Sequence, residues 1–135
     1  MEGFHFRKAT QALAHFSLRA GGHINYMKAL KLIWLSDRLH LMSYGRTITG
    51  DAYYAMKLGP VAVGTKDLIK RNSSPEENAY LARFVSEPDE FVIRLVEQPD
   101  PDVFSRSDIK ALDTIWDFYG KFGKYDLSKK SHNFP

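Results

Sequence analysis

The sequence of 135 residues contains no cysteine. That absence excludes a disulfide framework, an iron–sulfur site and a cysteine nucleophile, and it fits a reducing compartment. The apolar run that comes nearest to a membrane span, ALKLIWL, is too short and is interrupted by Lys31. The N-terminus, MEGFHFRKATQ, lacks the apolar core of a signal peptide. These absences predict a soluble, cytoplasmic protein without a membrane partner.

Motifs of metal and cofactor chemistry are absent as well. No two histidines stand four residues apart, and no HExxH arrangement occurs among His5, His15, His23, His40 and His132. The glycines form neither a GxxxxGKS/T nor a GxGxxG phosphate loop, and the GxSxG nucleophile elbow is missing. We therefore expect no cofactor, no metal and no catalytic residue, with surface or capping roles for the histidines.

Acidic residues are scarce in the first part of the chain. Residues 1–50 hold 7 Lys or Arg against 2 Asp or Glu, residues 51–100 hold 6 against 9, and residues 101–135 hold 6 against 5. The charge of +5 over the first 50 residues could attract a nucleic acid or an acidic protein. A solvated basic helix face explains the same excess, and nucleic-acid binders usually cluster more charge. Nucleic acid is therefore not the partner that we expect first.

What is present is mostly helical periodicity. Apolar residues recur at three- and four-residue steps over residues 4–20, and Gly21-Gly22 ends that helix. A second helix begins after Asn25, which is a good N-cap, and ends at Gly45. These two segments give the clearest secondary structure in the sequence.

The faces of the second helix follow from the same periodicity. Its buried stripe is expected to hold Met27, Leu30, Ile33, Trp34, Leu35, Leu39 and Met42. Lys28, Lys31 and Arg38 are expected to project to other faces. Asp37 stands three residues before His40, which predicts a local hydrogen bond between them.

Two further helices are expected towards the C-terminus. Ser107 caps a strongly periodic segment in which Trp116 faces the core, and Gly120 ends it. Trp116 and Trp34 are both expected to be buried, on helices that pack together. Ser128 is expected to cap a last, short helix.

The middle of the chain begins with a strand signal. Residues 53–58 are rich in aromatic side chains and are bounded by turn residues, which predicts a strand. Gly59 is expected to adopt a positive φ and to end the strand with Pro60. Pro60 is also expected to occupy the first position of a helix that continues to about Arg71.

The next stretch carries two conflicting signals. Ser74, with Glu77 as its capping-box partner, predicts the start of a helix. Residues 80–86 and 91–97 are apolar, β-branched and separated by a turn, a pattern that is typical of a hairpin. We expect one helical turn followed by this hairpin, which joins the strand at 53–58 in one sheet.

Together these elements predict an α+β fold that is mainly helical. About five helices pack with a small antiparallel β-sheet of about three short strands. A chain of this length can bury one core, so residues 1–135 are expected to form a single domain.

The candidates for recognition lie around one turn. Tyr53 and Tyr54 must point to opposite faces of a strand, so one of them belongs in the core and the other can be exposed. Tyr44 lies nearby in sequence, and an exposed tyrosine beside Arg46 is typical of a protein-binding hot spot. Two tyrosines half-buried in a small sheet explain the pair equally well. Asp51, which follows a glycine, suits a turn or a helix cap.

Four stretches carry a family resemblance. INYMKALKLIWLSDRLHLMSYGRTITGD is similar to an N-x-x-K-L-x-K-L-x-Y-x-x-D helix and its following turn, with Trp34 in place of the tyrosine. YYAMKLGPV is similar to a Y-x-A-x-x-x-G-P-V signature, and SRSDIKALDTIWDFYGKFGKYDLSKKSH to a C-terminal element that ends in L-S-x-x-x-H. The basic and aromatic first helix is compatible but not specific. Over residues 25–132 the chain resembles the Panacea domain family, the SocA-like antitoxins.

The resemblance implies a bacterial or phage antitoxin that neutralises a toxin encoded beside it by direct binding. One branch of the family is an adaptor that delivers its toxin to a Clp-type protease. The resemblance also implies that the domain has no enzymatic activity. Two other hypotheses stand beside it: a nucleic-acid-binding autoregulator of its own operon, and an enzyme that uses Asp51 or His40. No serine or threonine nucleophile stands at a recognisable spacing from an acid–base set of Asp37, His40 and Asp51.

We expect the toxin to dock around the turn and on the exposed side of the second helix. The residues that would contact it are Arg38, His40, Tyr44, Arg46, Asp51, Tyr53 and Tyr54. Basic charge there would steer an acidic toxin surface towards it, and loops held by rigid elements often carry recognition residues. The alternative docking surface is the acidic hairpin region that contains Glu87, Asp89, Glu90 and Glu97.

Overall fold

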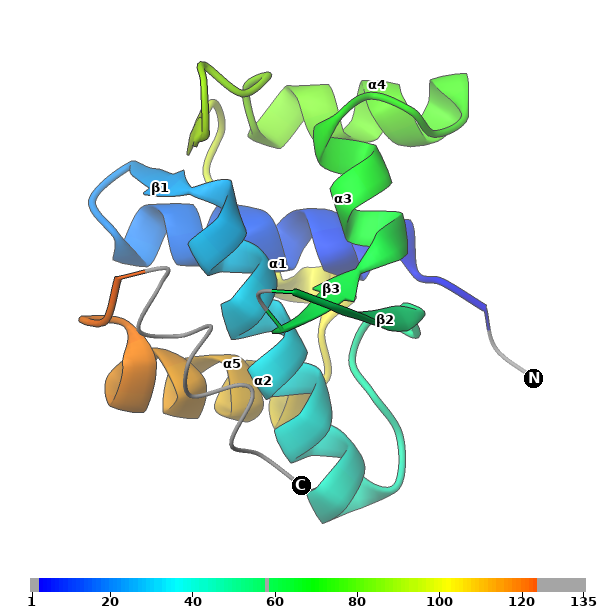
Figure 1. Ribbon diagram of the computed structural model, residues 1–135, viewed down its shortest axis with the longest axis vertical. Helices are drawn as coiled ribbons and strands as arrows, with labels where there is room; N and C mark the ends of the chain where they lie inside the picture. The colour runs from blue at the N-terminus through cyan, green and yellow to red at the C-terminus, as the bar shows by residue number, and fades with distance from the viewer. Residues whose placement is uncertain (1–2, 58, 124–135) are drawn as a thin grey trace.

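Helices account for more than half of the residues that the structure describes, as their apolar periodicity predicts. The structure is a computed structural model that describes residues 3–57 and 59–123. Its elements are α1 (Phe6–Arg19), β1 (His23–Asn25), α2 (Tyr26–Tyr44), β2 (Tyr53–Met56), β3 (Gly59–Ala62), α3 (Val63–Ile69), α4 (Pro75–Phe84), β4 (Val92–Arg94), the 3-10 turn η1 (Pro101–Val103) and α5 (Arg106–Tyr119). The predicted fold class, mainly helical α+β with five helices, is confirmed (Figure 1). The predicted helix at Ser128 lies outside the described residues.

The core forms around α1 and α2. Helix α1 contacts α2, α3 and α4, and α5 crosses α2 and packs against it (Figure 1). The largest fully buried apolar side chains are Phe16, Phe84, Leu13, Leu30, Leu32, Ile33, Ile48, Leu68, Ile69, Leu81 and Ile93. Burial of one such side chain stabilises the fold by about 1.5–3 kcal/mol before the entropy of ordering it is subtracted. No helix among the described residues is both long enough and apolar enough to cross a bilayer.

The predicted helix boundaries are confirmed where local capping chemistry sets them. The side-chain oxygen of Asn25 accepts the amides of Met27 and Lys28, and Gly45 ends α2 with φ +80°. Ser74 and Glu77 form the predicted capping box at α4. At α5 the predicted cap is wrong by two residues. The cap is Ser105, because Asp108 at the third helical position completes a capping box with it.

The Gly59-Pro60 pair does not open a helix. Residues 59–62 form β3, antiparallel to β2 with Tyr54 opposite Val61, and α3 begins at Val63. Gly59 has φ +106°, which confirms its predicted positive φ and permits the chain reversal. Proline can join a two-stranded ladder because an edge strand need not donate every amide. The residue that would end the predicted strand, Leu58, lies outside the described residues.

The predicted hairpin of residues 80–86 and 91–97 is wrong. The capping box at Ser74 starts a helix that continues to Phe84, because apolar residues three and four positions apart face α1. Strand β4 pairs instead with β1, and two isolated bridges, Val85 with Leu95 and Asp89 with Val92, are what remains of the hairpin. The described strands therefore form two two-stranded sheets rather than one three-stranded sheet.

The two tryptophans are only half-buried, which corrects the expectation that both are core residues. The expectation that α2 and α5 pack together is confirmed. Trp116 stacks on Phe16 with a centroid distance of 6.2 Å. Met42, also expected inside, is 73% exposed, because the last turn of α2 extends past the core.

Candidate partner-binding site

Asp37 holds the turn of residues 45–52, which joins α2 to β2. Its Oδ1 accepts the amide hydrogens of Ile48 and Thr49 at 2.8 and 3.0 Å. Its Oδ2 accepts the Thr49 hydroxyl at 2.6 Å and the Tyr53 hydroxyl. The predicted hydrogen bond between Asp37 and His40 is wrong, because this carboxylate is directed at the turn instead.

The buried environment around Asp37 shifts the pKa values of Asp37 and of Tyr53. Burial raises the pKa of Asp37, although the hydrogen bonds from Thr49, Tyr53 and the backbone oppose that effect. Burial, followed by the charge of Asp37, raises the pKa of Tyr53 well above its ordinary value. Tyr53 therefore keeps its proton at neutral pH and remains a hydrogen-bond donor to the carboxylate.

Asp51 caps α3 from outside the helix. The residue at the N-cap position of α3 is Ala62, which has no side-chain acceptor. Asp51 replaces it: Oδ1 accepts the Gly64 amide at 2.7 Å, and Oδ2 accepts the amide and hydroxyl of Thr65 at 2.8 and 2.7 Å. The predicted role of Asp51 as a cap is confirmed, and the far end of the 45–52 turn is fixed by it.

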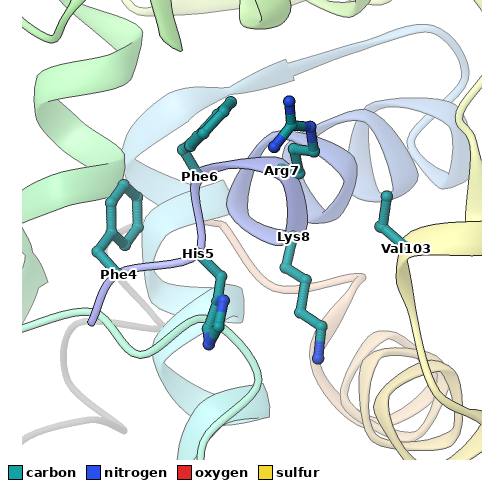
Figure 2. Close-up of a pocket in the computed structure, with 6 residues that line it drawn as sticks. All are labelled: Phe4, His5, Phe6, Arg7, Lys8 and Val103. Atoms are coloured by element: carbon teal, nitrogen blue, oxygen red, sulfur yellow. The ribbon is translucent and has the colours of Figure 1, made fainter. Parts of the chain in front are cut away.

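The N-terminal segment crosses the same turn. The His5 amide donates to the Thr49 carbonyl at 2.7 Å, and Gly50 has φ +69° beneath Gly3. Beside this segment is an open cleft of about 390 Å³, lined by Phe4, His5, Phe6, Arg7, Lys8 and Val103 (Figure 2). Figure 2 shows Lys8 pointing away from Phe6. Its ammonium lies 2.9 Å from Asp108, so the charge of Lys8 is already paired.

His40 sits in a buried polar cluster rather than on the surface. It is 0% exposed, which corrects the expectation of a surface or capping histidine at this position. Its Nδ1 lies 2.7 Å from the Arg46 carbonyl, and its Nε2 lies 2.8 Å from the Ser107 hydroxyl. A carbonyl can only accept, so Nδ1 carries a proton. Nε2 also lies 3.2 Å from Asp108 Oδ1, without the angle of a hydrogen bond.

Asp108 joins α5 to α1 and to the 45–52 turn. It pairs with Lys8 at 2.9 Å and with Arg46 at 3.1 Å while being 0% exposed. Burial alone would raise the pKa of Asp108. The hydrogen bonds from Lys8 and the Ser105 amide, with the charges of Lys8 and Arg46, outweigh burial and lower the pKa below its ordinary value. Asp108 is therefore a carboxylate at neutral pH.

The predicted contact residues divide into an inner and an outer set. His40 is buried, Tyr53 packs against the core, and Asp51 is engaged with α3. Tyr44 and Tyr54 are 53% and 62% exposed, Arg46 is exposed and Arg38 is half-buried. The expectation that one of the adjacent tyrosines is inside and the other outside is confirmed.

The sequence did not indicate that α5 forms a groove together with α2. A shallow groove of about 190 Å³ runs along the seam between α2 and α5. It is lined by Leu39, Ser43, Tyr44, Lys110, Ala111 and Thr114. Because these two segments are about 70 positions apart, only the packing of α2 against α5 reveals the groove.

Among the described residues there is no group of three or more potential metal ligands.

Lys31 is 1% exposed, which corrects the prediction that it projects away from the core. Its ammonium donates to the Pro60 carbonyl and so ties α2 to β3. Burial lowers the pKa of Lys31 from 10.5 to about 8. The charged form is therefore less stable in the folded protein than in the unfolded chain.

We expect this lysine to give an unusual dependence of stability on pH. Between pH 8 and 10.5 the unfolded chain keeps the Lys31 proton while the folded protein loses it. The free energy of unfolding should therefore rise with pH in this window, by at most about 1.4 kcal/mol per pH unit. Urea unfolding at pH 7.5, 8.5 and 9.5 measures the slope, and Lys31→Met is the control because it removes the titrating group. Parallel slopes for the two proteins would contradict the assignment.

The comparisons with known proteins yield one family. A family model described as antitoxin SocA-like, Panacea domain, matches residues 30–135. Neither a curated protein nor a solved structure shows a significant match. The matched range includes most of α2, the whole 45–52 turn, both strands of the β2–β3 sheet, and α5.

Proposed function

Because the chain belongs to the SocA-like Panacea domain family of antitoxins, whose model covers residues 30–135, we propose that it neutralises a cognate toxin by binding it directly. The sequence motifs predicted this family, and the match confirms it. The proposal places the protein in the cytoplasm of a bacterium or a phage-infected cell, beside a toxin encoded by the neighbouring gene.

The observation that carries the proposal is the construction of the 45–52 turn. Asp37 fixes the middle of the turn at Ile48 and Thr49, and Asp51 fixes its C-terminal end, through buried or half-buried hydrogen bonds. The turn therefore holds Arg46 on a fixed backbone, and the exposed rings of Tyr44 and Tyr54 lie on the elements that flank it. A backbone that is ordered before binding loses little entropy on binding, and Tyr and Arg are favoured as protein contacts.

The basic first 50 residues support this proposal over binding to nucleic acid. Each of their seven Lys and Arg side chains already lies against a carboxylate, a carbonyl or an aromatic ring of the protein: Arg7, Lys8, Arg19, Lys28, Lys31, Arg38 and Arg46. Charges engaged in this way release fewer counterions on phosphate. A gel shift with operator DNA at physiological salt tests the autoregulator hypothesis, which sequence-preferring binding would support.

We also propose that the protein acts without catalysis. His40 and Asp51, the candidates for an acid–base role, hold the turn and α3 respectively. The Ser107 hydroxyl does lie 2.8 Å from His40 Nε2, but Asp108 is on the same side of the ring. A nucleophile–base pair of the usual kind is oriented by an acid at the opposite nitrogen.

Delivery of the toxin to a Clp-type protease is the second way in which binding could neutralise it. The two routes separate in a measurement of toxin half-life. If the antitoxin inhibits by occupancy alone, the half-life is unchanged in cells that lack the protease. If the antitoxin is an adaptor, the toxin is degraded only when both the antitoxin and the protease are present.

We expect Tyr54→Ala to weaken toxin binding without unfolding the protein. The Tyr54 ring is 62% exposed, so its loss leaves no core cavity, and a hot-spot tyrosine contributes at least about 2 kcal/mol of affinity, roughly 30-fold in Kd. Calorimetric titration with the toxin, together with growth rescue on co-expression, measures the effect. Val96→Ala is the matched control, since Val96 is also 62% exposed but lies after β4.

Two outcomes would contradict the proposed docking surface around the 45–52 turn. Parental affinity and full rescue by folded Tyr54→Ala would exclude the turn as the docking surface. Loss of rescue by folded Glu90→Lys, with Tyr54→Ala active, would place the toxin on the acidic region around Glu90 instead. Arg46→Ala is a less clean test, because Arg46 also pairs with Asp108.

A further inference from the structure

We propose that the groove between α2 and α5 receives one bulky apolar side chain of the toxin, from a segment whose flanking residues are acidic. This inference rests on the proposed function and adds the chemistry of the partner. The site is the groove lined by Leu39, Ser43 and Tyr44 of α2 and by Lys110, Ala111 and Thr114 of α5.

The size of the groove selects a single side chain. Its volume is about 190 Å³, whereas pockets for small-molecule ligands span about 300–1,000 Å³. A cavity of about 150 Å³ is enough for one benzene ring. The groove therefore fits one phenyl or branched aliphatic side chain better than a cofactor or a metabolite.

The wall that α2 gives to the groove is partly apolar. Leu39 is half-buried in this wall, and Tyr44 is 53% exposed. The Tyr44 ring lies 4.7 Å from the buried imidazole of His40, which sets its position. Ala111 is buried at the seam, so its small side chain leaves room for an incoming group. The exposed part of the Tyr44 ring is apolar surface that an incoming side chain would cover, which favours binding.

The charges around the groove favour an acidic binding segment. Residues 38–50 contain no Asp or Glu. Asp108, in the first turn of α5, is buried and paired with Lys8 and Arg46. Exposed Lys110 lines one wall, and exposed Arg46 follows the end of α2. Carboxylates beside the inserted side chain would meet the charge of Lys110 on α5 and the one net positive charge of the Lys8–Asp108–Arg46 cluster beyond the end of α2, which speeds association and fixes orientation.

The same charges disfavour a second copy of this chain as the occupant. A two-fold symmetric dimer through this face would place Arg46 and Lys110 of one protomer against the same basic surface of its partner. Like charges brought together across an interface oppose association. A toxin segment with an apolar side chain and flanking carboxylates matches both the apolar lining and Lys110.

Two substitutions test the groove and its charge separately. Ser43→Trp fills the groove from an exposed helical position, and Ala82→Trp is its control at an exposed position of α4. Lys110→Glu reverses the wall charge, and Lys66→Glu on α3 is its control. With the toxin encoded by the neighbouring gene, we expect Ser43→Trp to raise Kd at least 30-fold. Lys110→Glu should raise Kd about 10-fold, mainly by slowing association, and both controls should stay within twofold.

A photocrosslink identifies the inserted segment. p-Benzoylphenylalanine at position 43 should give a toxin adduct, and at position 82 it should give none. The adduct should map to a toxin segment in which an apolar residue stands within four positions of Asp or Glu. An adduct on a basic segment, or affinities of the groove variants equal to those of the controls, would overturn the inference while growth rescue by the parent protein still supports the antitoxin role. If the parent protein neither binds the toxin nor rescues growth, the proposed function itself fails.

Discussion

Asp37→Ala is expected to detach the 45–52 turn from α2 and to lower the free energy of unfolding by about 3–5 kcal/mol. The substitution removes the acceptor for two buried amides, those of Ile48 and Thr49, and for the hydroxyls of Thr49 and Tyr53. Each buried donor left without a partner costs about 1–3 kcal/mol. Because a domain is held by only about 5–15 kcal/mol, this single change should threaten folding.

Asp37→Asn separates the charge of this group from its shape. The amide oxygen can still accept from the Ile48 and Thr49 backbone, while the amide nitrogen faces two hydroxyls that can turn to accept. Burial raises the pKa of Asp37, so a neutral replacement also avoids the desolvation of a carboxylate. We expect Asp37→Asn to lose only about 1–2 kcal/mol.

Urea unfolding at pH 7 followed by circular dichroism measures both changes. Asp67→Ala is the control, because Asp67 is an exposed aspartate on the neighbouring helix α3. A parental midpoint for Asp37→Ala would mean that the turn does not depend on this carboxylate. Equal losses for the alanine and asparagine variants would mean that its charge, rather than its hydrogen-bonding geometry, holds the turn.

The residues that carry the family resemblance are mostly parts of the scaffold. Asn25 caps α2, Lys28 donates to the carbonyl of Gly120 at the end of α5, and Lys31 donates to Pro60 of β3. Asp37, the last polar residue of the same motif, binds the 45–52 turn. Helix α2 is thus tied to three other segments by its own signature. The signature identifies the family and its fold, and it does not identify a partner.

Local chemistry made part of the molecule predictable from the sequence. Caps at Asn25 and Ser74, and the alternation of Tyr53 and Tyr54, involve residues within a few positions of each other. The errors involve distant segments. Residues 92–94 pair with β1, about 70 positions earlier, and no short-range pattern shows that pairing.

The site was only partly predictable for the same reason. Arg46, Tyr44 and Tyr54 could be chosen from one stretch of sequence, and all three are exposed. The burial of His40 depends on Ser107 and Asp108, and the groove depends on α5 packing against α2. Periodicity places a polar residue on a helix face but does not show which distant partner covers it.

Gly50→Ala is expected to destabilise the protein by about 2–5 kcal/mol and to abolish toxin neutralisation. Gly50 has φ +69°, and a Cβ built there would lie 2.4 Å from the carbonyl oxygen of Gly3. The left-handed conformation costs a residue with a Cβ about 1–2 kcal/mol, and the clash adds about 1–3 kcal/mol unless the backbone moves. The clash is relieved if the N-terminal segment moves away from the turn, or if the turn itself shifts. Both movements change the surface around the turn.

Gly45→Ala isolates the contact with the N-terminal segment from the cost of the backbone conformation. Gly45 has φ +80°, and a Cβ there would meet nothing within 4 Å. Its substitution should therefore lose only about 1–2 kcal/mol. Urea unfolding gives the difference in the free energy of unfolding between the two variants. Growth rescue tests whether each variant still neutralises the toxin. A shifted turn would displace Arg46 and Tyr54 together, so folded Gly50→Ala should fail to rescue growth where folded Gly45→Ala succeeds. Equal stability losses in the two variants would mean that residues 3–5 do not press on the turn. Full rescue by Gly50→Ala would mean that the toxin is insensitive to the turn's position.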